Sequence, residues 1–390
     1  MATIKQYTKK DGKKAWQFQT YLGINQATGK PIKTTRRGFS TKKEAQLELN
    51  RLLVEFEENG LAKEHNETFE EVFELWFDNY RKTVKESTYL TTERHLKRHA
   101  LPLLGKYKIA KINVKVAQKA VNKWASDLSS YKIILQYCSK IMDYAISLEI
   151  IASNPFSRII RPNKKQNKNE DKLKHYNINE VQKVMSFLEK RVEDSLSSPL
   201  LKQYFAHYDL ALYRLLAFSG IRGGEASALN WSDIDFSKKT ISISKTLSEV
   251  KDGFKISTPK TKSSNRTISL DEKTVIILKK WQLKQREFHF TNGINSNSMI
   301  FVNYNCSLMN RTDLYQRSKR LAEAVGLPNI GTHGWRHSHA SMLFEAGITM
   351  KEAQERLGHS SIAQTMDTYT HLTEKTKKET VQKLVKLANF

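Results

Sequence analysis

Residues 332–341 of the 390-residue chain read THGWRHSHAS, and residues 357–372 read LGHSSIAQTMDTYTHL. His333 and Arg336 stand three residues apart in the first stretch, which places both side chains on one face of a helix. The second stretch starts at the end of one predicted helix, passes through a glycine and enters another helix that carries Tyr369. Histidine, arginine and tyrosine side chains are therefore predicted at helix starts and turns in this region.

Two further stretches upstream carry basic residues at predicted turns. Residues 219–225, SGIRGGE, place Arg222 on a sharp turn at the start of a helix, where free backbone N–H groups add to the attraction of an anion. Residues 259–266, PKTKSSNR, predict a lysine-rich hairpin that carries Lys260 and Lys262. This distribution of basic residues favours an anionic ligand.

The signatures of several enzyme classes are absent from the sequence. It has no GxxxxGK[ST] loop, no GxGxxG, no HExxH and no CxxC pair, so ATP-driven, dinucleotide-dependent and common zinc chemistries lose support. Asp233 and Asp235 could chelate a divalent metal, but they lie in a predicted turn, where aspartate is common. His333, His337 and His339 could share a zinc ion, but the arginine among them would repel a cation. We expect neither a metal nor another cofactor.

The composition indicates a folded and strongly basic protein. The sequence has 65 Lys and Arg against 40 Asp and Glu, a formal net charge of +25, and 39% hydrophobic residues. That apolar content excludes a disordered chain, and no run approaches the roughly 18 apolar residues of a membrane span. Because the charge is spread along the chain, nucleic acid is favoured over a membrane as the partner. Two cysteines and the absence of an apolar signal segment favour a reducing cytoplasm.

Residues 1–60 predict a small sheet followed by one helix. Asp11–Gly12 is a hairpin turn signal, and apolar and polar residues alternate over 16–22 with the period of a half-buried strand. A second turn leads into a third strand, and Thr41 with Glu44 forms a capping box for the helix. A separate basic module of three strands and one helix is therefore expected.

The rest of the chain divides into three predicted segments. Residues 66–160 carry helical stripes of apolar residues and predict a bundle of about four helices, the last of which stops at Asn154–Pro155. Residues 161–174 have almost no apolar residue and predict an exposed, flexible linker. Residues 175–390 predict an α+β, mostly helical domain. Its final segment, 374–390, predicts a helix whose apolar face packs on its own domain or on a neighbouring protomer.

The stretches SGIRGGE, PKTKSSNR, THGWRHSHAS and LGHSSIAQTMDTYTHL resemble, in order and spacing, the signature boxes of the tyrosine recombinase (phage integrase) family. The resemblance implies a multidomain protein: an arm-type DNA-binding domain at 1–60, a helical core-binding domain at 66–160, and a tyrosine recombinase catalytic domain at 175–390. Such an order is typical of integrases from temperate phages and integrative elements. Trp335 stands where the family more often has leucine, a departure that concerns packing.

The same resemblance implies a role for each residue of the boxes. Phosphodiester exchange develops charge on non-bridging oxygens, which arginine forks match in geometry. A phenol with a pKa of about 10 needs a base, and the leaving 5′-oxygen needs a proton. The implied assignments are Tyr369 as nucleophile, Arg222 and Arg336 as phosphate clamps, His333 as base, Lys260 as general acid with Lys262 as the fallback, His359 as a hydrogen-bond partner of the phosphate, and Glu225 as support for the basic residues.

The implied activity is site-specific DNA recombination through a 3′-phosphotyrosyl intermediate, which integrates and excises a mobile element or prophage. The implied partners are double-stranded DNA with core and arm-type attachment sites, a homotetramer on that DNA, a host DNA-bending protein and an excision factor, without a membrane. The implied location is the bacterial cytoplasm, at the nucleoid. The expected DNA contacts of the arm-type domain are Lys13, Lys14, Lys33, Arg36 and Arg37.

Three other functions share part of this pattern. A nicking-closing topoisomerase uses the same chemistry, but the arm-type module and the basic linker do not favour this class of protein. A DNA-binding regulator could keep the fold without the activity, and a metal-dependent nuclease could also cut DNA. EDTA separates the nuclease from the others, and covalent trapping on a nicked oligonucleotide separates the regulator.

Overall fold

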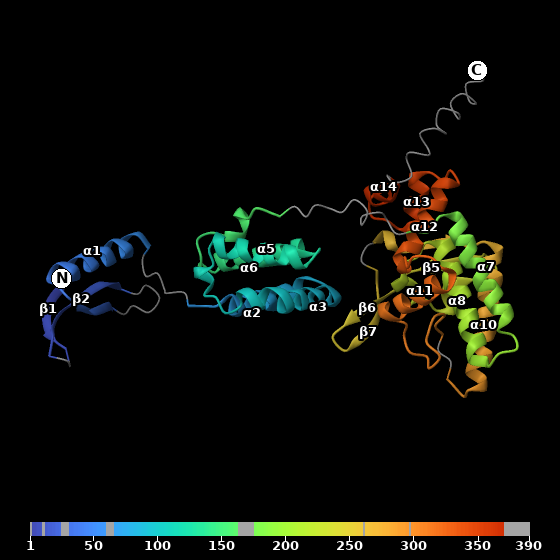
Figure 1. The fold of residues 1–390 in the computed structure, drawn as a ribbon, viewed down its shortest axis with the longest axis horizontal. Helices are drawn as coiled ribbons and strands as arrows, with labels where there is room; N and C mark the ends of the chain where they lie inside the picture. The colour runs from blue at the N-terminus through green and yellow to red at the C-terminus, as the bar shows by residue number, and fades with distance from the viewer. Residues whose placement is uncertain are drawn as a thin grey trace, which may run out of the picture. The chain divides into compact units, whose positions relative to one another are not determined.

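The computed structural model gives the course of the chain over most of its length (Figure 1). The described residues are 2–9, 12–24, 31–59, 66–162, 175–259, 262–295 and 298–369. Contacts divide the chain into two compact units, one of Met1–Thr83 with Thr92–Asn163 and one of Val84–Thr91 with Lys164–Phe390. Within the described ranges, no helix is long and apolar enough to cross a membrane.

The N-terminal part is an antiparallel sheet followed by one helix. Its elements are β1 (Thr3–Thr8), β2 (Lys14–Ile24), β3 (Pro31–Phe39) and α1 (Lys42–Asn59), with the strands in the order β1-β2-β3. Phe18 of β2 is fully buried and packs with Ala45 and Leu49 of α1, as the alternation along this strand predicts. Gly12 takes a φ of 81° in the turn between β1 and β2, and Asp11 lies outside the described residues. The predicted three-strand module with one helix is confirmed.

The next part is helical. Its elements are α2 (Phe69–Thr83), α3 (Glu86–His95), the π-helical turn η1 (Leu96–Ala100), α4 (Leu101–Leu104), η2 (Ile109–Lys111), α5 (Val114–Asp127), α6 (Tyr131–Ser147) and η3 (Pro155–Arg158). A capping box opens α2, because Thr68 Oγ1 accepts from the N–H of Glu71 and the Glu71 carboxylate accepts from the N–H of Thr68. Trp76 and Tyr80 then stack at 4.6 Å between ring centroids. The predicted helical class of this part is confirmed.

The last long helix of this part ends earlier than predicted. The sequence places its end at Asn154–Pro155, whereas α6 ends at Ser147. Glu149 takes a left-handed φ of 59°, a conformation that glycine more often supplies at a helix end. The sequence therefore carries no glycine signal at the true end, and the proline instead begins the short turn η3.

The C-terminal part combines a central helix with surrounding helices and two small sheets. Its elements are α7 (Ile178–Asp194), α8 (Leu200–Ser219), α9 (Gly223–Ala226), η4 (Trp231–Asp233), β4 (Ile234–Asp235), β5 (Thr240–Ile243), β6 (Thr246–Val250), β7 (Gly253–Ser257), η5 (Lys262–Ser264), β8 (Arg266–Ser269), α10 (Glu272–Thr291), α11 (Arg311–Val325), α12 (Gly331–Glu345), α13 (Met350–Leu357) and α14 (Ile362–Tyr369). The strands form the sheets β4-β5-β8 and β6-β7. The α8 helix packs against α7, α10 and α12. The predicted α+β, mostly helical class is confirmed.

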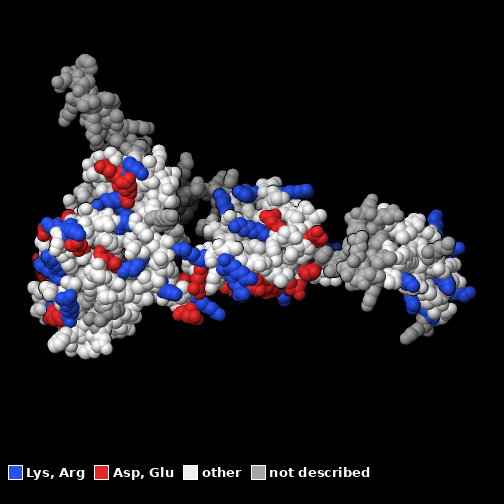
Figure 2. All heavy atoms as spheres, turned by 180° about the vertical axis from the view of Figure 1, so that it is seen from behind, with Lys and Arg blue, Asp and Glu red and all other residues white. Residues whose placement is uncertain are grey.

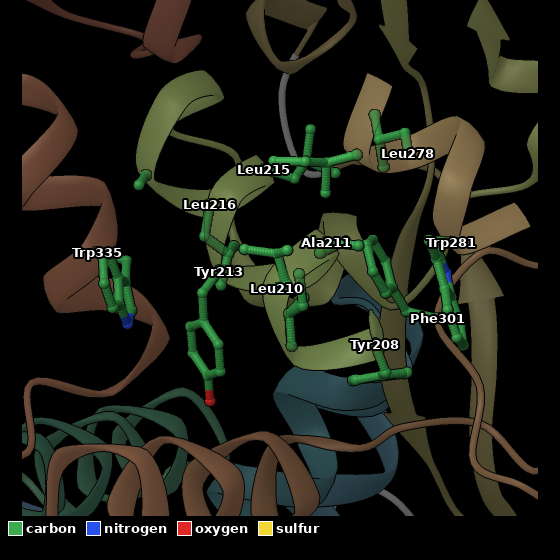
Figure 3. Packing of buried hydrophobic residues seen from close by; sticks show 14 of the residues in the cluster. Tyr208, Leu210, Ala211, Tyr213, Leu215, Leu216, Leu278, Trp281, Phe301 and Trp335 are labelled. Atoms are coloured by element: carbon green, nitrogen blue, oxygen red, sulfur yellow. The ribbon is translucent and has the colours of Figure 1, made fainter. Parts of the chain in front are cut away.

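Large aromatic side chains fix the helices around α8 (Figure 3). Trp335 of α12 is 1% exposed, and its ring lies 5.5 Å from that of Tyr213 on α8 and 5.3 Å from that of Tyr176. On another side of α8, Tyr208 meets Trp281 of α10 edge to face at 5.5 Å. The ring of Trp335 therefore packs α12 against α8.

The lysine-rich stretch 259–266 does not form the predicted hairpin. Strand β5 pairs with β8, and a hairpin of β6 and β7, which the sequence pattern did not reveal, precedes the stretch. The stretch therefore joins strands of two different sheets and contains the turn η5. Lys260, residues 163–174 of the predicted linker and the tail at 374–390 lie outside the described residues.

Candidate active site

The short helix α9 carries a buried carboxylate that pairs with two arginines. Glu225 is 2% exposed, and it accepts hydrogen bonds from Arg222 Nη1 at 2.8 Å and from Arg266 Nη2 at 3.0 Å. Arg222 stands at the start of α9, as predicted, and its backbone N–H also donates to Glu225. Burial raises the pKa of Glu225, but the hydrogen bonds and charges of both arginines outweigh it and hold the pKa below its ordinary value. The ionised carboxylate therefore fixes both guanidinium groups.

Arg336 of α12 is a third arginine beside this pair, and it is buried. It is 2% exposed, and its Nη1 donates to Gly220 O at 2.8 Å. Burial first, and then the positive charges of Arg222 and Arg266, lower the pKa of Arg336 to about 9. The group still carries its charge at neutral pH, although its positive neighbours and its desolvation both oppose that charge. An anion that entered beside it would relieve this strain.

The end of α13 receives one hydrogen bond from each of the three arginines. The pairs are Arg266 Nε to Arg356 O at 2.9 Å, Arg336 Nη2 to Leu357 O at 2.7 Å, and Arg222 Nη2 to Gly358 O at 3.4 Å. The last carbonyls of a helix have no N–H donor within the helix, so they can accept hydrogen bonds from arginine side chains. Three consecutive carbonyls thus orient three guanidinium groups.

Glycine is required at two turns of this site. Gly358 has a φ of 69°, and a Cβ there would lie 2.9 Å from Arg266 Cδ and 2.9 Å from Ser263 O. Gly220 has a φ of 64°, and a Cβ there would lie 2.4 Å from His339 Cδ2. The glycines in SGIRGGE and LGHSS therefore allow the close approach of the chain segments that carry the arginines.

His333 and His337 lie one turn apart on α12 and contact each other. Their ring centroids are 4.5 Å apart, with an angle of 82° between the planes. Burial first, and then the charges of Arg336, Arg222 and Arg311, lower the pKa of His333 below its ordinary value. The imidazole is therefore neutral near pH 7 and has a ring nitrogen free of a proton, as a general base requires.

His359 follows the glycine turn after α13. Its Nδ1 lies 2.9 Å from the hydroxyl of Thr365, a fully buried residue of α14. Burial first, and then the charges of Arg336 and Arg222, lower the pKa of His359 to about 3. The neutral ring keeps one N–H donor, which suits a hydrogen bond to a non-bridging phosphate oxygen.

The cluster carries more positive than negative charge. Arg222 and Arg266 share the carboxylate of Glu225, whereas Arg336 donates to the carbonyls of Gly220 and Leu357, which carry no full charge. The side chain of Arg222 is 38% exposed, so it reaches the surface. Such a group of planar donors can bind a phosphate.

The structure brings together most of the predicted site residues. One cluster contains Arg222, Glu225, Arg336 and His359. His333 lies close enough to it that the charges of Arg222 and Arg336 lower the pKa of its imidazole. Tyr369 is the last residue of α14, which packs against α12 and α13. The side chains of Tyr369 and Lys262 and the whole of Lys260 lie outside the described residues.

The residues of the two metal sites that the sequence left open make other contacts in the structure. Asp233 pairs with Lys245 at 2.8 Å, and Asp235 accepts from backbone N–H groups of its own turn. His339 lies close to the Ala217 carbonyl, with 2.8 Å between Nδ1 and O, while His333 contacts His337. Over the part of the chain that the structure describes, no group of three or more His, Cys, Asp or Glu side chains could hold a metal.

Two arginines of the site were not singled out from the sequence. Arg266 is the last residue of the stretch PKTKSSNR. Its position at the start of a strand does not predict that its side chain contacts Glu225. Arg356 precedes LGHSS in a helix with many charged residues, where an arginine is ordinarily exposed. The position of Arg266 within one of the signature boxes could have indicated a role in the site. Arg356 lies outside these boxes, and the sequence gives no such indication for it.

The predicted DNA contacts of the N-terminal part lie on its surface. Arg36, Arg37 and Lys33 are exposed on β3, and Lys13 and Lys14 are exposed at the start of β2. Arg36 also pairs with Glu48 of α1 at 3.4 Å. Figure 2 shows Lys and Arg, without visible Asp or Glu, on the face of this part that it presents.

Three family models match the chain in the order of its parts. The model described as "Arm DNA-binding domain" matches residues 3–56, and "Phage integrase, N-terminal SAM-like domain" matches residues 68–125. The model described as "Phage integrase family" matches residues 177–376, which is more than half of the chain. All of the described residues of the arginine and histidine cluster fall within this last range.

Similar proteins carry consistent names. The ICEBs1 integrase of Bacillus subtilis (strain 168) is 29% identical over 95% of this chain and 96% of its own length. A tyrosine recombinase XerC-like protein of Caldanaerobacter subterraneus subsp. tengcongensis is 28% identical over 96% of this chain and 97% of its own, and the integrase of Staphylococcus phage L54a is 27% identical over 82% and 93%. The solved structure of the Tn1549 transposon integrase with a circular intermediate DNA has a TM-score of 0.64 at 20% identity, and the match covers 82% of this chain and 99% of that one.

The fold and the site define a tyrosine-type DNA recombinase. The chain belongs to the phage integrase family. It is an enzyme, a site-specific recombinase that binds DNA and breaks and rejoins its strands. The predictions of family, fold class and function from the sequence are confirmed.

The buried histidines predict how the stability of this part depends on pH. Burial first, and then the charge of Arg356, lower the pKa of His339 to about 3, and this residue is 5% exposed. An unfolded chain binds the proton near pH 6.5, so the free energy of unfolding falls as the pH drops below about 6.5, with a slope of up to about 1.4 kcal/mol per pH unit. We expect His339→Gln to flatten this slope in the catalytic-domain transition followed by calorimetry between pH 7 and pH 4. An unchanged slope would contradict the assignment.

Proposed function

We propose that the arginine and histidine cluster binds the scissile phosphate of DNA and that Tyr369 attacks it. The phenol oxygen forms a bond to phosphorus, the bond to the 5′-oxygen breaks, and a 3′-phosphotyrosyl intermediate results. Attack by the 5′-hydroxyl of another strand reverses these steps and frees the tyrosine, so neither a metal nor a nucleotide cofactor is needed. The observation that carries this proposal is the convergence of three arginines on one helix end, where two of them also pair with one buried carboxylate.

The described side chains suit distinct tasks in this reaction. Arg222 and Arg336 stabilise the charge that develops on the non-bridging oxygens, while His359 donates a hydrogen bond to one of them. His333, neutral because its pKa is lowered, takes the proton of the phenol. Glu225 holds Arg222 in place, and Lys260 gives the leaving 5′-oxygen its proton, with Lys262 as the alternative donor.

Four functional segments are proposed along the chain. Residues 1–60 read arm-type sites through Lys13, Lys14, Lys33, Arg36 and Arg37, which the exposure of these side chains supports. Residues 66–160 bind the core site, 161–174 link the two halves, and 175–390 hold the chemistry.

We expect the protein to act on attachment sites in the nucleoid of a bacterial cell as a homotetramer. Four active sites are needed because two duplexes each exchange two strands. A host DNA-bending protein and an excision factor would bring arm and core sites together. The names of the relatives, an ICEBs1 integrase and the integrase of a staphylococcal phage, support integration and excision of a mobile element as the biological role.

Tyr369→Phe removes only the nucleophilic oxygen, so we expect strand cleavage to be abolished and DNA binding to stay almost unchanged. The measurement is a gel assay for an SDS-resistant protein–DNA adduct on a nicked core-site duplex, with a gel-shift titration of the same proteins. Wild-type protein is the positive control. An adduct formed by the Tyr369→Phe protein would refute the assignment.

Lys260→Ala should regain cleavage on a substrate whose bridging 5′-oxygen is replaced by sulfur, because a thiolate leaves without a proton. Arg222→Ala and Arg336→Ala should not regain it, since they act on the non-bridging oxygens. Cleavage rates on the oxygen and sulfur substrates test this difference. If Lys262→Ala rather than Lys260→Ala is rescued, Lys262 is the general acid.

Deletion of residues 1–60 should weaken binding to long DNA with both site types while leaving cleavage of an isolated core site intact. Two tethered binding units raise the effective concentration of each other's sites, so their loss removes avidity. The salt slope should also flatten by about 0.9 for each phosphate that the shortened protein no longer neutralises. Gel-shift titrations at several salt concentrations measure both effects, and unchanged affinity for the distal sites would contradict the proposal.

A further inference from the structure

Arg356 stands in the last turn of α13, and its side chain links three other elements. Its Nε donates to His339 Nε2 at 3.1 Å, while its Nη2 donates to Phe218 O at 2.9 Å and to Ser269 O at 3.2 Å. His339 lies on α12, Phe218 near the end of α8 and Ser269 at the end of β8. Because a guanidinium is a rigid planar fork, these bonds fix both the position and the orientation of the helix end.

His339 takes part in this link as a neutral ring with a defined tautomer. Arginine can only donate, so Nε2 of His339 carries no proton, and Nδ1–H donates to Ala217 O at 2.8 Å. Because the side chain is 5% exposed, water does not compete for either bond. The ring lies directly under Gly220, the turn that leads into Arg222.

The helix end that Arg356 fixes carries the acceptors of the phosphate clamp. Leu357 O accepts from Arg336 and Gly358 O accepts from Arg222. The carbonyl of Arg356 itself accepts from Arg266, which holds Glu225 from the other side. Since these carbonyls belong to consecutive residues, a shift of the helix end moves all of them together.

We propose that Arg356, held by His339, is a positioning residue for the clamp on the scissile phosphate. It keeps Leu357 O and Gly358 O where they orient Arg336 and Arg222, and it acts through these carbonyls rather than by contact with DNA. This inference rests on the proposed function, which gives the two clamp arginines their task.

The consequence falls on the chemical step. If the guanidinium of Arg356 is removed, Phe218 O and Ser269 O lose a hydrogen-bond donor, and the end of α13 is free to shift. A displacement of about 1 Å in a group that stabilises a transition state lowers a rate on the order of 100-fold. Binding depends on many phosphate contacts over a wider basic surface, so affinity for DNA is affected far less.

Arg356→Met tests whether the rate of cleavage falls while the affinity for DNA is kept, because methionine has a long unbranched side chain without hydrogen-bond donors. The full-length protein is assayed on a nicked duplex with the core sequence from the boundary of the element. Single-turnover formation of the covalent adduct is expected to slow by about tenfold to 100-fold, with DNA affinity within about twofold of wild type. A wild-type cleavage rate would overturn the proposal.

A second substrate separates positioning from general support of the fold. A methylphosphonate at the scissile position replaces one charged non-bridging oxygen with a neutral methyl group, so it demands less of the clamp arginines. The defect of Arg356→Met should shrink on this substrate, as should that of Arg336→Ala. An equal defect of Arg356→Met on both substrates would overturn the proposal.

Matched variants complete the experiment. Lys351→Met removes a positive charge from the exposed face of the same helix, where Lys351 pairs with Glu355 at the surface, and should cleave at the wild-type rate. His339→Leu removes the acceptor and should reproduce the Arg356→Met behaviour, whereas His339→Gln, which keeps an acceptor, should cleave faster than His339→Leu. If calorimetry finds Arg356→Met unfolded, the His339→Leu protein decides, and wild-type rates for it overturn the proposal.

The same assay distinguishes a failure of the proposed function from a failure of the role assigned to Arg356. Wild-type protein that forms no adduct with the core duplex would refute the recombinase mechanism itself. Wild-type protein that forms the adduct beside an equally fast Arg356→Met protein would refute only the role of Arg356.

Discussion

The meeting of three guanidinium groups at the end of α13 is the constraint on which the catalytic part depends. Arg222, Arg266 and Arg336 repel one another, and two of them are almost fully removed from water. One carboxylate, Glu225, and three helix-end carbonyls offset this repulsion. A buried charge that loses its partners costs several kcal/mol, so these arginines are stable only where rigid surroundings hold their acceptors in place.

That rigidity comes from the packing around α8. The helix is buried along most of its length, and aromatic rings from α10 and α12 lock its sides. Its last residue, Ser219, leads straight into Gly220 and Arg222, so the aromatic core sets the place where the first arginine emerges. Trp335 does the same for α12, one residue before Arg336. Core packing and charge placement are therefore parts of a single arrangement.

The sequence was sufficient for features that local patterns encode. Asn177 and Glu180 form a capping box at the start of α7, a feature that their spacing encodes, and Arg222 lies on the turn predicted for it. The partners of the buried arginines could not be predicted, because Arg222 reaches a carbonyl 136 residues away and Arg266 reaches one 90 residues away. Helical or strand periodicity says nothing about such distant pairs. The early end of α6 could not be predicted either, because Glu149, and not a glycine, takes the left-handed conformation after this helix.

The electrostatics of the arginine cluster favour the transition state over the bound substrate. Three arginines and one glutamate leave two positive charges in excess. A phosphodiester in the ground state carries one negative charge, whereas attack by the phenolate adds a second charge to the same oxygens. The site therefore matches the reacting phosphate more closely than the resting one, and interactions stronger in the transition state are those that raise a rate. Because the guanidinium groups are already held by carbonyls and by Glu225, little reorganisation is left for the moment of reaction.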